Sequence, residues 1–257
     1  MTVFEKTVRE TVRFEGVGLH TGLPSSVVVH PAEPGTGIVF VRTDRDPNLR
    51  IPAVVENVER GDNQGRQTSL RSGDVRIGTI EHLMAALHGL GVDNALIEVE
   101  GEELPGLDGS AIGYYDRIRR SGLAESRKER RVIAVKKPLY VDGKNHSMAV
   151  LPAENFSISY TLSYDHADLP DQFVHFEFSP EIFEREIAPA RTFCLKEEAE
   201  ALLKLGYGRG ANYQNTLVFE EGEPIGNALR FPDEAARHKV LDLVGDLYLA
   251  GCGIRGH

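Results

Sequence analysis

The sequence predicts an α+β fold made of two similar domains, each with a β-sheet layer packed against helices. Three observations lead to this prediction. Apolar residues alternate with polar ones at the start of each half of the chain, which is typical of half-buried strands. Apolar residues at helical spacing follow in each half. A strongly charged stretch, "AESRKERR" at 124–131, separates the halves. Strands that precede helices in each half are the element order of α+β units.

The first half runs from alternating segments to helical ones, with Pro and Gly at the turns between them. Apolar spacing predicts a helix over 79–91, with Thr79 as its N-cap and Gly89 or Gly91 at its end. The other elements predicted for this half are strands at 6–16, 25–33, 37–44, 52–59, 66–78 and 94–101 and a helix at 109–122.

The second half repeats this order of elements without a convincing repeat of residues. Strands are predicted at 132–142, 146–153, 156–164 and 172–179, and helices at 180–187, 195–206 and 233–251. We therefore predict an N-terminal domain at 1–124, a linker at 125–131 and a C-terminal domain at 132–257.

Composition excludes some classes of function. A net charge of −10 argues against a nucleic-acid-binding protein, although it leaves room for an anionic small-molecule substrate. Cys194 and Cys252 are too few for a disulfide framework and fit a reduced, cytoplasmic compartment. The N-terminus lacks an apolar signal core, and no apolar run approaches the roughly 20 residues of a membrane span. We expect a monomer with at most peripheral membrane contact.

The stretch "RHKVLDLVGD" at 237–246 places His238, Asp242 and Asp246 on one face of a predicted helix. Residues four apart on a helix are neighbours, so His238 and Asp242 could bind one metal ion. Taken alone, this window more often represents a surface ion pair.

A second window, "TIEHLMAAL", places Glu81 and His82 in the first turn of a helix, where free N–H groups favour a carboxylate. Alone, it is more often a polar helix edge. Together with His238 and Asp242, His82 completes the two-His, one-carboxylate set of a catalytic zinc site that keeps one position open. Glu81 could then take a proton from water, which is chemistry suited to hydrolysis. A purely structural interpretation, without metal, remains open at this point.

Five ordered motifs carry a resemblance to a known family. They are "FEGVGLHTG" at 14–22, "TIEHLMAALHGLGVDNALIEV" at 79–99, "ELPGLDGSA" at 103–111, "ARTFC" at 190–194 and "RHKVLDLVGDLYLAG" at 237–251. With these motifs the chain resembles the UDP-3-O-acyl-N-acetylglucosamine deacetylases, zinc hydrolases of bacterial lipid A biosynthesis.

The resemblance implies a site between the two domains with Zn²⁺ as its cofactor. His82, His238 and Asp242 match the zinc ligands of the family, and Glu81 matches its general base. The substrate implied is a small molecule, an acylated UDP-N-acetylglucosamine, and the reaction is removal of its acetyl group. In the family this is the committed step of lipid A biosynthesis.

Further roles follow only from the resemblance. Thr192 matches a residue that stabilises the oxyanion, Phe193 and Lys239 match contacts to the sugar and phosphate, and Asp246 matches the support of a later histidine. The segment near 192–219 matches an insert that forms a passage for the acyl chain.

Simpler interpretations stand beside these roles. Thr192 could satisfy backbone groups, Phe193 could be core, Lys239 could be solvated, and Asp246 could pair with an Arg. His20 is expected in a turn, and Asp108 is expected to cap the helix after it. The histidines expected to be structural or solvent-facing are His30, His88, His146, His166 and His175.

One departure from the family concerns the C-terminus. Members continue to a Gly-His motif, followed by Leu-Asn, whose histidine acts as general acid. This sequence ends at "GCGIRGH", and His257 comes too soon after Asp246 to be that histidine. The sequence therefore resembles a member with an incomplete second domain. Two hypotheses follow: a zinc-dependent deacetylase, or a catalytically weak protein of the same fold that binds zinc and a nucleotide sugar.

Overall fold

A computed structural model describes residues 3–60, 67–164, 166 and 168–257 of the chain; Arg66, at the start of the predicted 66–78 strands, lies outside them. The largest sheet described has the strand order β2-β3-β8-β4-β5 and comes from the first half. Its strands are Val12–Val17 (β2), Pro24–Pro31 (β3), Ala95–Glu100 (β8), Ile38–Arg42 (β4) and Ile51–Pro52 (β5). Neighbours are antiparallel except β4 and β8, which are parallel. The predicted α+β class is confirmed.

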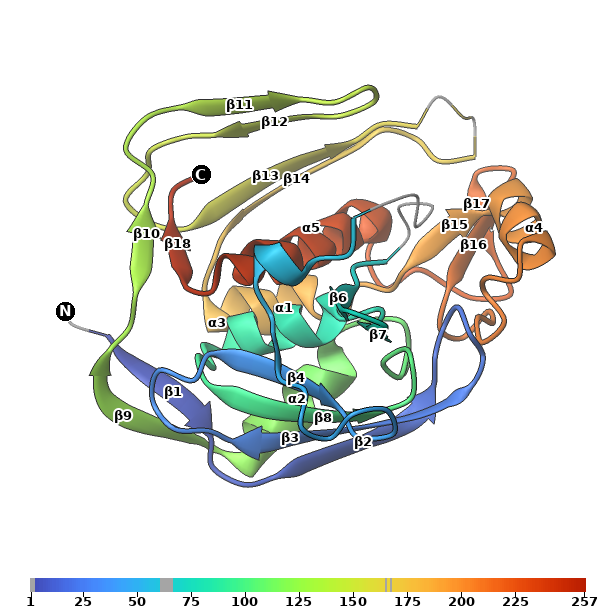
Figure 1. Ribbon diagram of the computed structural model, residues 1–257. Helices are drawn as coiled ribbons and strands as arrows, with labels where there is room; N and C mark the ends of the chain where they lie inside the picture. Colours follow the sequence, from blue (N-terminus) through green and yellow to red (C-terminus); the bar gives the residue numbers. More distant parts are fainter. Residues whose placement is uncertain (1–2, 61–66, 165, 167) are drawn as a thin grey trace.

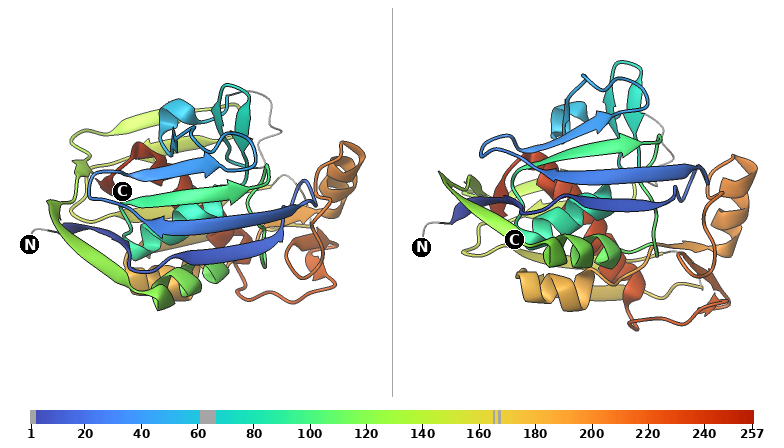
Figure 2. Two further views of the ribbon diagram at one scale, coloured as in Figure 1. Left: turned by 60° about the horizontal axis from the view of Figure 1, so that its bottom comes forward. Right: turned by 90° about the horizontal axis from the view of Figure 1, so that it is seen from below.

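One face of this sheet is buried beneath two helices, α1 (Glu81–Leu90) and α2 (Ile112–Ser121) (Figure 2). Alternation produces that face: Phe14 pairs with Val27 across β2 and β3, and Val29 pairs with Ile97 across β3 and β8. All four side chains are buried, as expected when one side of an antiparallel sheet faces the core.

The helix α1 is the centre of the molecule, and every one of its residues is buried. It lies between the sheet and α5 (Glu234–Leu247), as Figure 1 shows. A helix that is covered on all sides needs apolar or small residues all round, which "LMAAL" and Gly89 supply. At the crossing, a Cβ added to Gly245 of α5 would lie 2.2 Å from the Glu81 carbonyl oxygen. Glycine at 245 therefore permits the close approach of the two helices.

Gly245→Ala should destabilise the protein. Alanine favours a helix by roughly 1 kcal/mol over glycine, but the new methyl group meets backbone that cannot rotate away, and such overpacking costs about 1–3 kcal/mol. The denaturant midpoint should therefore fall. The matched control is Gly253→Ala, whose Cβ would lie at an ordinary 3.5 Å from Val132 Cγ2. A Gly245→Ala protein as stable as this control would show that α1 and α5 are not in close contact.

The second half also forms small two-stranded sheets, and two of these, both hairpins, lie on the side of α5 that faces away from α1 (Figure 1). β13 and β14 pack directly on α5. The sheets are formed by Val132–Ala134 (β10) with Gly253–Arg255 (β18), Leu139–Asp142 (β11) with Ser147–Val150 (β12), and Ser157–Leu162 (β13) with Gln172–Glu177 (β14). The short helical elements Pro180–Ile182 (α3) and Phe183–Ile187 (η2) follow β14, and Tyr248–Ala250 (η3) follows α5.

A three-stranded sheet and one helix form a unit that projects from one side of the molecule (Figures 1 and 2). Its elements are Phe193–Leu195 (β15), Lys196–Lys204 (α4), Leu217–Glu220 (β16) and Glu223–Ile225 (β17). The backbone N–H groups of Arg209 and Gly210 donate to the carbonyls of His20 and Leu19. These bonds attach the projecting unit to the "GVGLHTG" turn of the first half.

The segment predicted as a linker is largely a strand. β9 (Leu123–Glu129) pairs antiparallel with β1 (Phe4–Val8), so its charged side chains lie on a mostly exposed strand. Several strand boundaries were wrong: 6–16 contains two strands, and 132–142 contains β10 and β11. The segment 52–59 forms the end of β5, a 3₁₀ turn at Val55–Asn57 (η1) and an isolated bridge from Val58 to Leu70. The predicted strands at 66–78 form the hairpin of Leu70–Ser72 (β6) and Val75–Ile77 (β7).

Two predicted helix caps were also wrong. Thr79 has φ +55° and precedes the N-cap position of α1, which is Ile80. Its hydroxyl donates to Glu103 Oε1 at 2.9 Å instead of satisfying the helix. Asp108 accepts from the backbone and hydroxyl of Ser110, whereas α2 begins only at Ile112. The end of α1 at Gly91, with φ +70°, is confirmed.

The hydrophobic core is continuous from the first half to the second and includes side chains of α1, α2, α5 and β13. The division into two domains at 125–131 stays a prediction. Within the described part of the chain, no helix has the length and apolarity to cross a membrane.

Candidate metal centre

The crossing of α1 and α5 brings His82, His238 and Asp242 together. One ligand atom of each lies within 4.8 Å of the others. His82 comes from the first turn of α1, while His238 and Asp242 are one turn apart on α5. Both histidines are 3% exposed, so almost none of their surface is in contact with solvent. The spacing "His-x-x-x-Asp" therefore faces the inside of the molecule and not its surface.

The geometry of these atoms fits a metal ion. Asp242 Oδ1 lies 3.3 Å from His238 Nε2 and 3.7 Å from His82 Nε2. Two ligands at zinc distances of about 2.0–2.1 Å in a tetrahedron are separated by about 3.4 Å. Among the described residues, the buried Asp242 Oδ1 and His82 Nδ1 make no hydrogen bond. Buried polar atoms without partners are costly, and a cation between the three side chains would supply Asp242 with one.

His238 is oriented by the backbone. Its Nδ1 lies 3.0 Å from the Ala190 carbonyl oxygen and donates to it. This bond fixes the tautomer, so that Nε2 carries the free lone pair and faces Asp242. A backbone carbonyl that accepts from the other ring nitrogen is a usual partner of a metal-binding imidazole.

The protonation states also suit a metal. Burial, together with the neighbouring His238, lowers the pKa of His82 to about 4. Burial lowers the pKa of His238 as well. For Asp242, burial raises the pKa, but His238 and Lys239 outweigh it and hold the pKa at about 2. At neutral pH the cluster therefore offers two neutral imidazoles and one carboxylate, as metal binding requires.

Glu81 lies beside the cluster without belonging to its ligand set. Its carboxyl is buried, and burial, followed by the charges of Asp242 and Asp246, raises its pKa well above the ordinary value. Glu81 Oε2 accepts a hydrogen bond of 3.0 Å from the Thr68 N–H. A buried carboxyl with a raised pKa beside a metal site has the character of a general base.

Thr68 is a site residue that sequence reasoning missed. Besides its bond to Glu81, its hydroxyl donates to Asp246 Oδ1 at 2.7 Å. Burial raises the pKa of Asp246 to about 6, despite this hydrogen bond. Asp246 therefore has Thr68 as its partner and not the Arg that a structural interpretation suggested. Nothing in the local sequence "RQTSLRSG" distinguished Thr68 from an ordinary strand residue.

Thr192, Phe193 and Lys239 line the same cavity of about 440 Å³ as the cluster. Phe193 lies with its ring centre 6.4 Å from that of His238. Lys239 Nζ donates to Asp242 Oδ2 at 2.7 Å, while its side chain is 36% exposed. The remaining lining residues are Leu19, His20, Gln67, Thr68, Thr79, Glu81, His82, Tyr164, His238, Asp242 and Asp246.

Other histidines lie outside this cavity. His88 is buried and stacks on Tyr248, with ring centres 4.4 Å apart, which is a structural role as expected. His257 Nδ1 lies 2.8 Å from the Ser157 hydroxyl, in the hairpin layer. Unlike these two, His20, which was expected first as a turn residue, lines the cavity.

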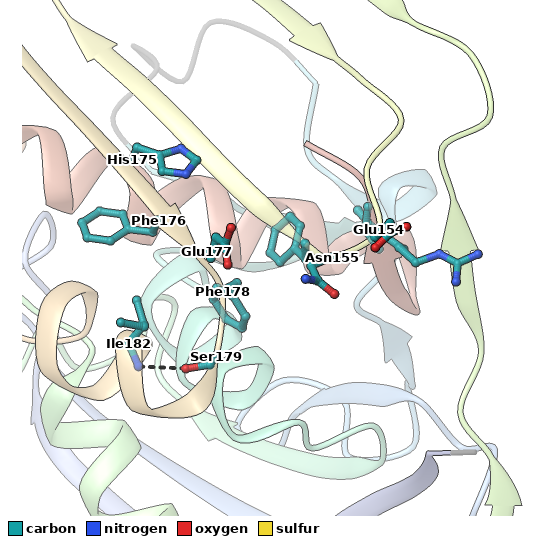
Figure 3. A pocket seen from close by; sticks show the side chains of 11 residues that line it. Glu154, Asn155, His175, Phe176, Glu177, Phe178, Ser179 and Ile182 are labelled. Carbon is teal, nitrogen blue, oxygen red and sulfur yellow. Dashed lines mark hydrogen bonds between the residues drawn. The ribbon is translucent and has the colours of Figure 1, made fainter. Parts of the chain in front are cut away.

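A second cavity, of about 610 Å³, lies beneath β14 (Figure 3). Phe156, Phe176, Phe178 and Ile182 give it an apolar lining. Figure 3 shows the hydrogen bond at the start of α3 in which the Ser179 hydroxyl accepts from the Ile182 N–H. Among the residues that the structure describes, no group of metal-ligating side chains gathers there. Among the described residues, the group that could hold a metal ion therefore lies in the cavity at the α1–α5 crossing.

Comparison with known proteins finds matches that extend over almost the whole chain. A sequence profile of the UDP-3-O-acyl N-acetylglycosamine deacetylase family matches residues 5–257. The UDP-3-O-acyl-N-acetylglucosamine deacetylase of Geobacter sp. (strain M21) is 40% identical over 256 residues, 99% of this chain and 83% of the relative. The protein of that name from Myxococcus xanthus (strain DK1622) is 38% identical over 254 residues, 98% of this chain and 80% of the relative. The protein of that name from Coxiella burnetii (strain Dugway 5J108-111) is 38% identical over 255 residues, which are 98% of this chain and 83% of the relative.

Proposed function

Because the chain belongs to the UDP-3-O-acyl N-acetylglycosamine deacetylase family, we propose that it is a zinc-dependent hydrolase that removes the acetyl group from UDP-3-O-acyl-N-acetylglucosamine. In lipid A biosynthesis this would be the committed step, carried out in the cytoplasm. The observation that supports the proposal best is the buried set of His82, His238 and Asp242 beside the protonatable Glu81. The family resemblance expected from the five motifs is confirmed.

His82, His238 and Asp242 would hold the zinc ion, leaving one position open. Zinc, when bound, supplies Lewis-acid polarisation of water and of the amide carbonyl. Because the two imidazoles are neutral and Asp242 contributes the only ligand charge, a zinc ion held by these three side chains would keep a net positive charge together with them. That charge favours the negative oxygen that develops when water attacks an amide.

Glu81 would accept the proton of the attacking water. Its carboxyl is held by the Thr68 N–H, so it cannot swing into the ligand set without losing that bond. Burial, followed by the charges of Asp242 and Asp246, raises its pKa well above the ordinary value, which makes it a better proton acceptor than an exposed carboxylate. Thr68 also holds Asp246, so one residue keeps both acids in fixed relative positions.

Thr192 would donate its hydroxyl to the oxyanion, and Phe193 and Lys239 would contact the sugar and phosphate. All three line the cavity, which supports these roles. Lys239 is bonded to Asp242, so a phosphate in the site would compete with that carboxylate for the ammonium group. The projecting unit near 192–219 begins at Thr192 and would receive the acyl chain.

The test is release of acetate from UDP-3-O-acyl-N-acetylglucosamine by the purified chain. The proposal expects turnover that a zinc chelator abolishes and added zinc restores. A chain that binds zinc and the nucleotide sugar but releases no acetate would instead be the binding protein of the alternative hypothesis. A chain that binds no zinc would remove both.

A further inference from the structure

We propose that the buried ion pair of Arg191 and Glu234 is a positioning device for the metal centre, fixing the metal-facing orientation of His238 and the place of Thr192. Neither residue lines the cavity, so they act through their neighbours and not on the substrate. The inference rests on the proposed function, because it concerns the same zinc site.

The pair is buried completely. Arg191 is 3% exposed and Glu234 is 0% exposed. Glu234 Oε1 accepts from Arg191 Nε at 2.8 Å and from the Arg191 backbone N–H at 3.0 Å. Glu234 Oε2 accepts from Arg191 Nη2 at 3.1 Å and from the Arg230 backbone N–H at 2.6 Å. One carboxylate therefore holds the side chain and the backbone of the same arginine.

Because Glu234 is hydrogen-bonded to both the side chain and the backbone of Arg191, the backbone at Ala190 and Arg191 is fixed relative to α5. The Ala190 carbonyl accepts the hydrogen bond that selects the tautomer of His238. Glu234 lies one helical turn before His238 on α5. The carboxylate and the imidazole on one helix thus bind two adjacent points of one loop, and the imidazole cannot rotate while the loop is held.

The same loop carries Thr192. Its backbone N–H donates to the Gly109 carbonyl at 2.8 Å, and its carbonyl accepts from Leu217 N at 2.8 Å. Arg191 adds a third attachment, since its Nη2 donates to the Ala228 carbonyl at 2.7 Å. The loop is therefore tied to α5, to the first half and to the projecting unit at consecutive residues.

Stability alone does not account for a pair of this kind. Two buried charges are expensive to desolvate, and a well-packed apolar pair of similar volume is often as stable or more so. An apolar pair makes no directional hydrogen bonds. It therefore cannot hold the backbone at Arg191 in one position, as the Glu234 carboxylate does by accepting from both the N–H and the guanidinium of Arg191. Loss of these hydrogen bonds should weaken metal binding, because groups that orient metal ligands typically contribute 10–100-fold in affinity.

The experiment replaces both charges, in Arg191→Met with Glu234→Met, and measures Zn²⁺ affinity of the metal-free chain by competition with a chromophoric chelator. The visible spectrum of the Co²⁺ form reports the ligand geometry. We expect a folded double variant that binds Zn²⁺ roughly 10–100-fold more weakly, with an altered Co²⁺ spectrum. The turnover number should fall more than KM rises, since Thr192 moves as well.

The matched control is Arg42→Met with Asp44→Met. Arg42 is 4% exposed and its Nε and Nη2 donate to Asp44 at 2.8 and 2.7 Å, but neither residue lines the cavity. This control should keep the Zn²⁺ affinity and the Co²⁺ spectrum of the unchanged chain. Should the 191/234 double variant fail to fold, Glu234→Gln takes its place, because glutamine keeps only one acceptor oxygen, and the amide nitrogen that replaces Oε2 cannot accept from Arg191 Nη2 and the Arg230 N–H.

A folded 191/234 variant with unchanged Zn²⁺ affinity and an unchanged Co²⁺ spectrum would overturn the inference and make the pair merely structural. That result differs from failure of the proposed function, in which the unchanged chain itself would bind no Zn²⁺. Equal loss of affinity in the 42/44 control would also overturn it, because the effect would then be general destabilisation.

Discussion

Replacing His238 with alanine should remove most of the bound zinc and, with it, nearly all acetate release. His238 presents Nε2 towards Asp242 while Nδ1 is held by the Ala190 carbonyl, and alanine has no side-chain atom that can bind a metal. Loss of a direct ligand should weaken zinc binding by more than the roughly 10–100-fold that outer partners contribute. Metal analysis of the purified variant and an acetate-release assay measure the two effects.

The matched control is His175→Ala. His175 lies on β14, is exposed, and bonds through Nδ1 to the Ser159 hydroxyl. That variant should keep its zinc and its activity. Stoichiometric zinc in the His238→Ala protein would show that α5 does not contribute a ligand at this position.

Replacing Glu81 with glutamine should slow turnover by roughly 10²–10⁴-fold while zinc stays bound. Glutamine keeps the shape of the side chain and can still accept from the Thr68 N–H through its amide oxygen. It cannot take a proton from water. The measurement is a comparison of turnover numbers at saturating substrate, together with zinc content.

Zinc content decides what a loss of activity means in this variant. If zinc leaves with the Glu81→Gln change, the carboxyl is a ligand and the assignment as base is wrong; near-normal turnover would exclude the role as well. Glu10→Gln, on an exposed turn, is the control for loss of one negative charge and should be neutral.

The sequence predicted which residues belong to the candidate site better than it predicted how they come together in space. His238 and Asp242 could be joined by helical spacing alone, because both belong to one helix. His82 could be added only through the chemistry of zinc ligands and the family resemblance. Its proximity depends on the crossing of α1 and α5, which Gly245 permits, and no pattern within either helix specifies a partner helix.

Hydrogen bonds between segments distant in sequence were not predictable. Thr68 binds Glu81 and Asp246, the latter 178 positions away, with no local signal. Thr79 resembled an N-cap because threonine follows a turn there, but the buried Glu103 takes its hydroxyl. The ion pair of Arg191 and Glu234 could not be predicted either, since each residue alone resembles an ordinary surface charge.

Elements with strong apolar patterns were predicted well, and charged edges were not. The alternation in β3 and the helical spacing in α1 reflect burial, which tertiary structure enforces. β9 has few apolar residues and is mostly exposed, and among the described strands it pairs with β1 alone, so its sequence showed no sign of a strand. Backbone pairing stabilises such a strand without leaving a trace in side-chain periodicity.

Titration of Zn²⁺ into the metal-free chain, with acetate release from UDP-3-O-acyl-N-acetylglucosamine as the readout, is the most direct test of a zinc site at the α1–α5 crossing. Activity should be negligible without metal, rise in proportion to added zinc, and level off at about one zinc per chain, the number that His82, His238 and Asp242 can hold. Full acetate release by the metal-free chain would contradict the assignment.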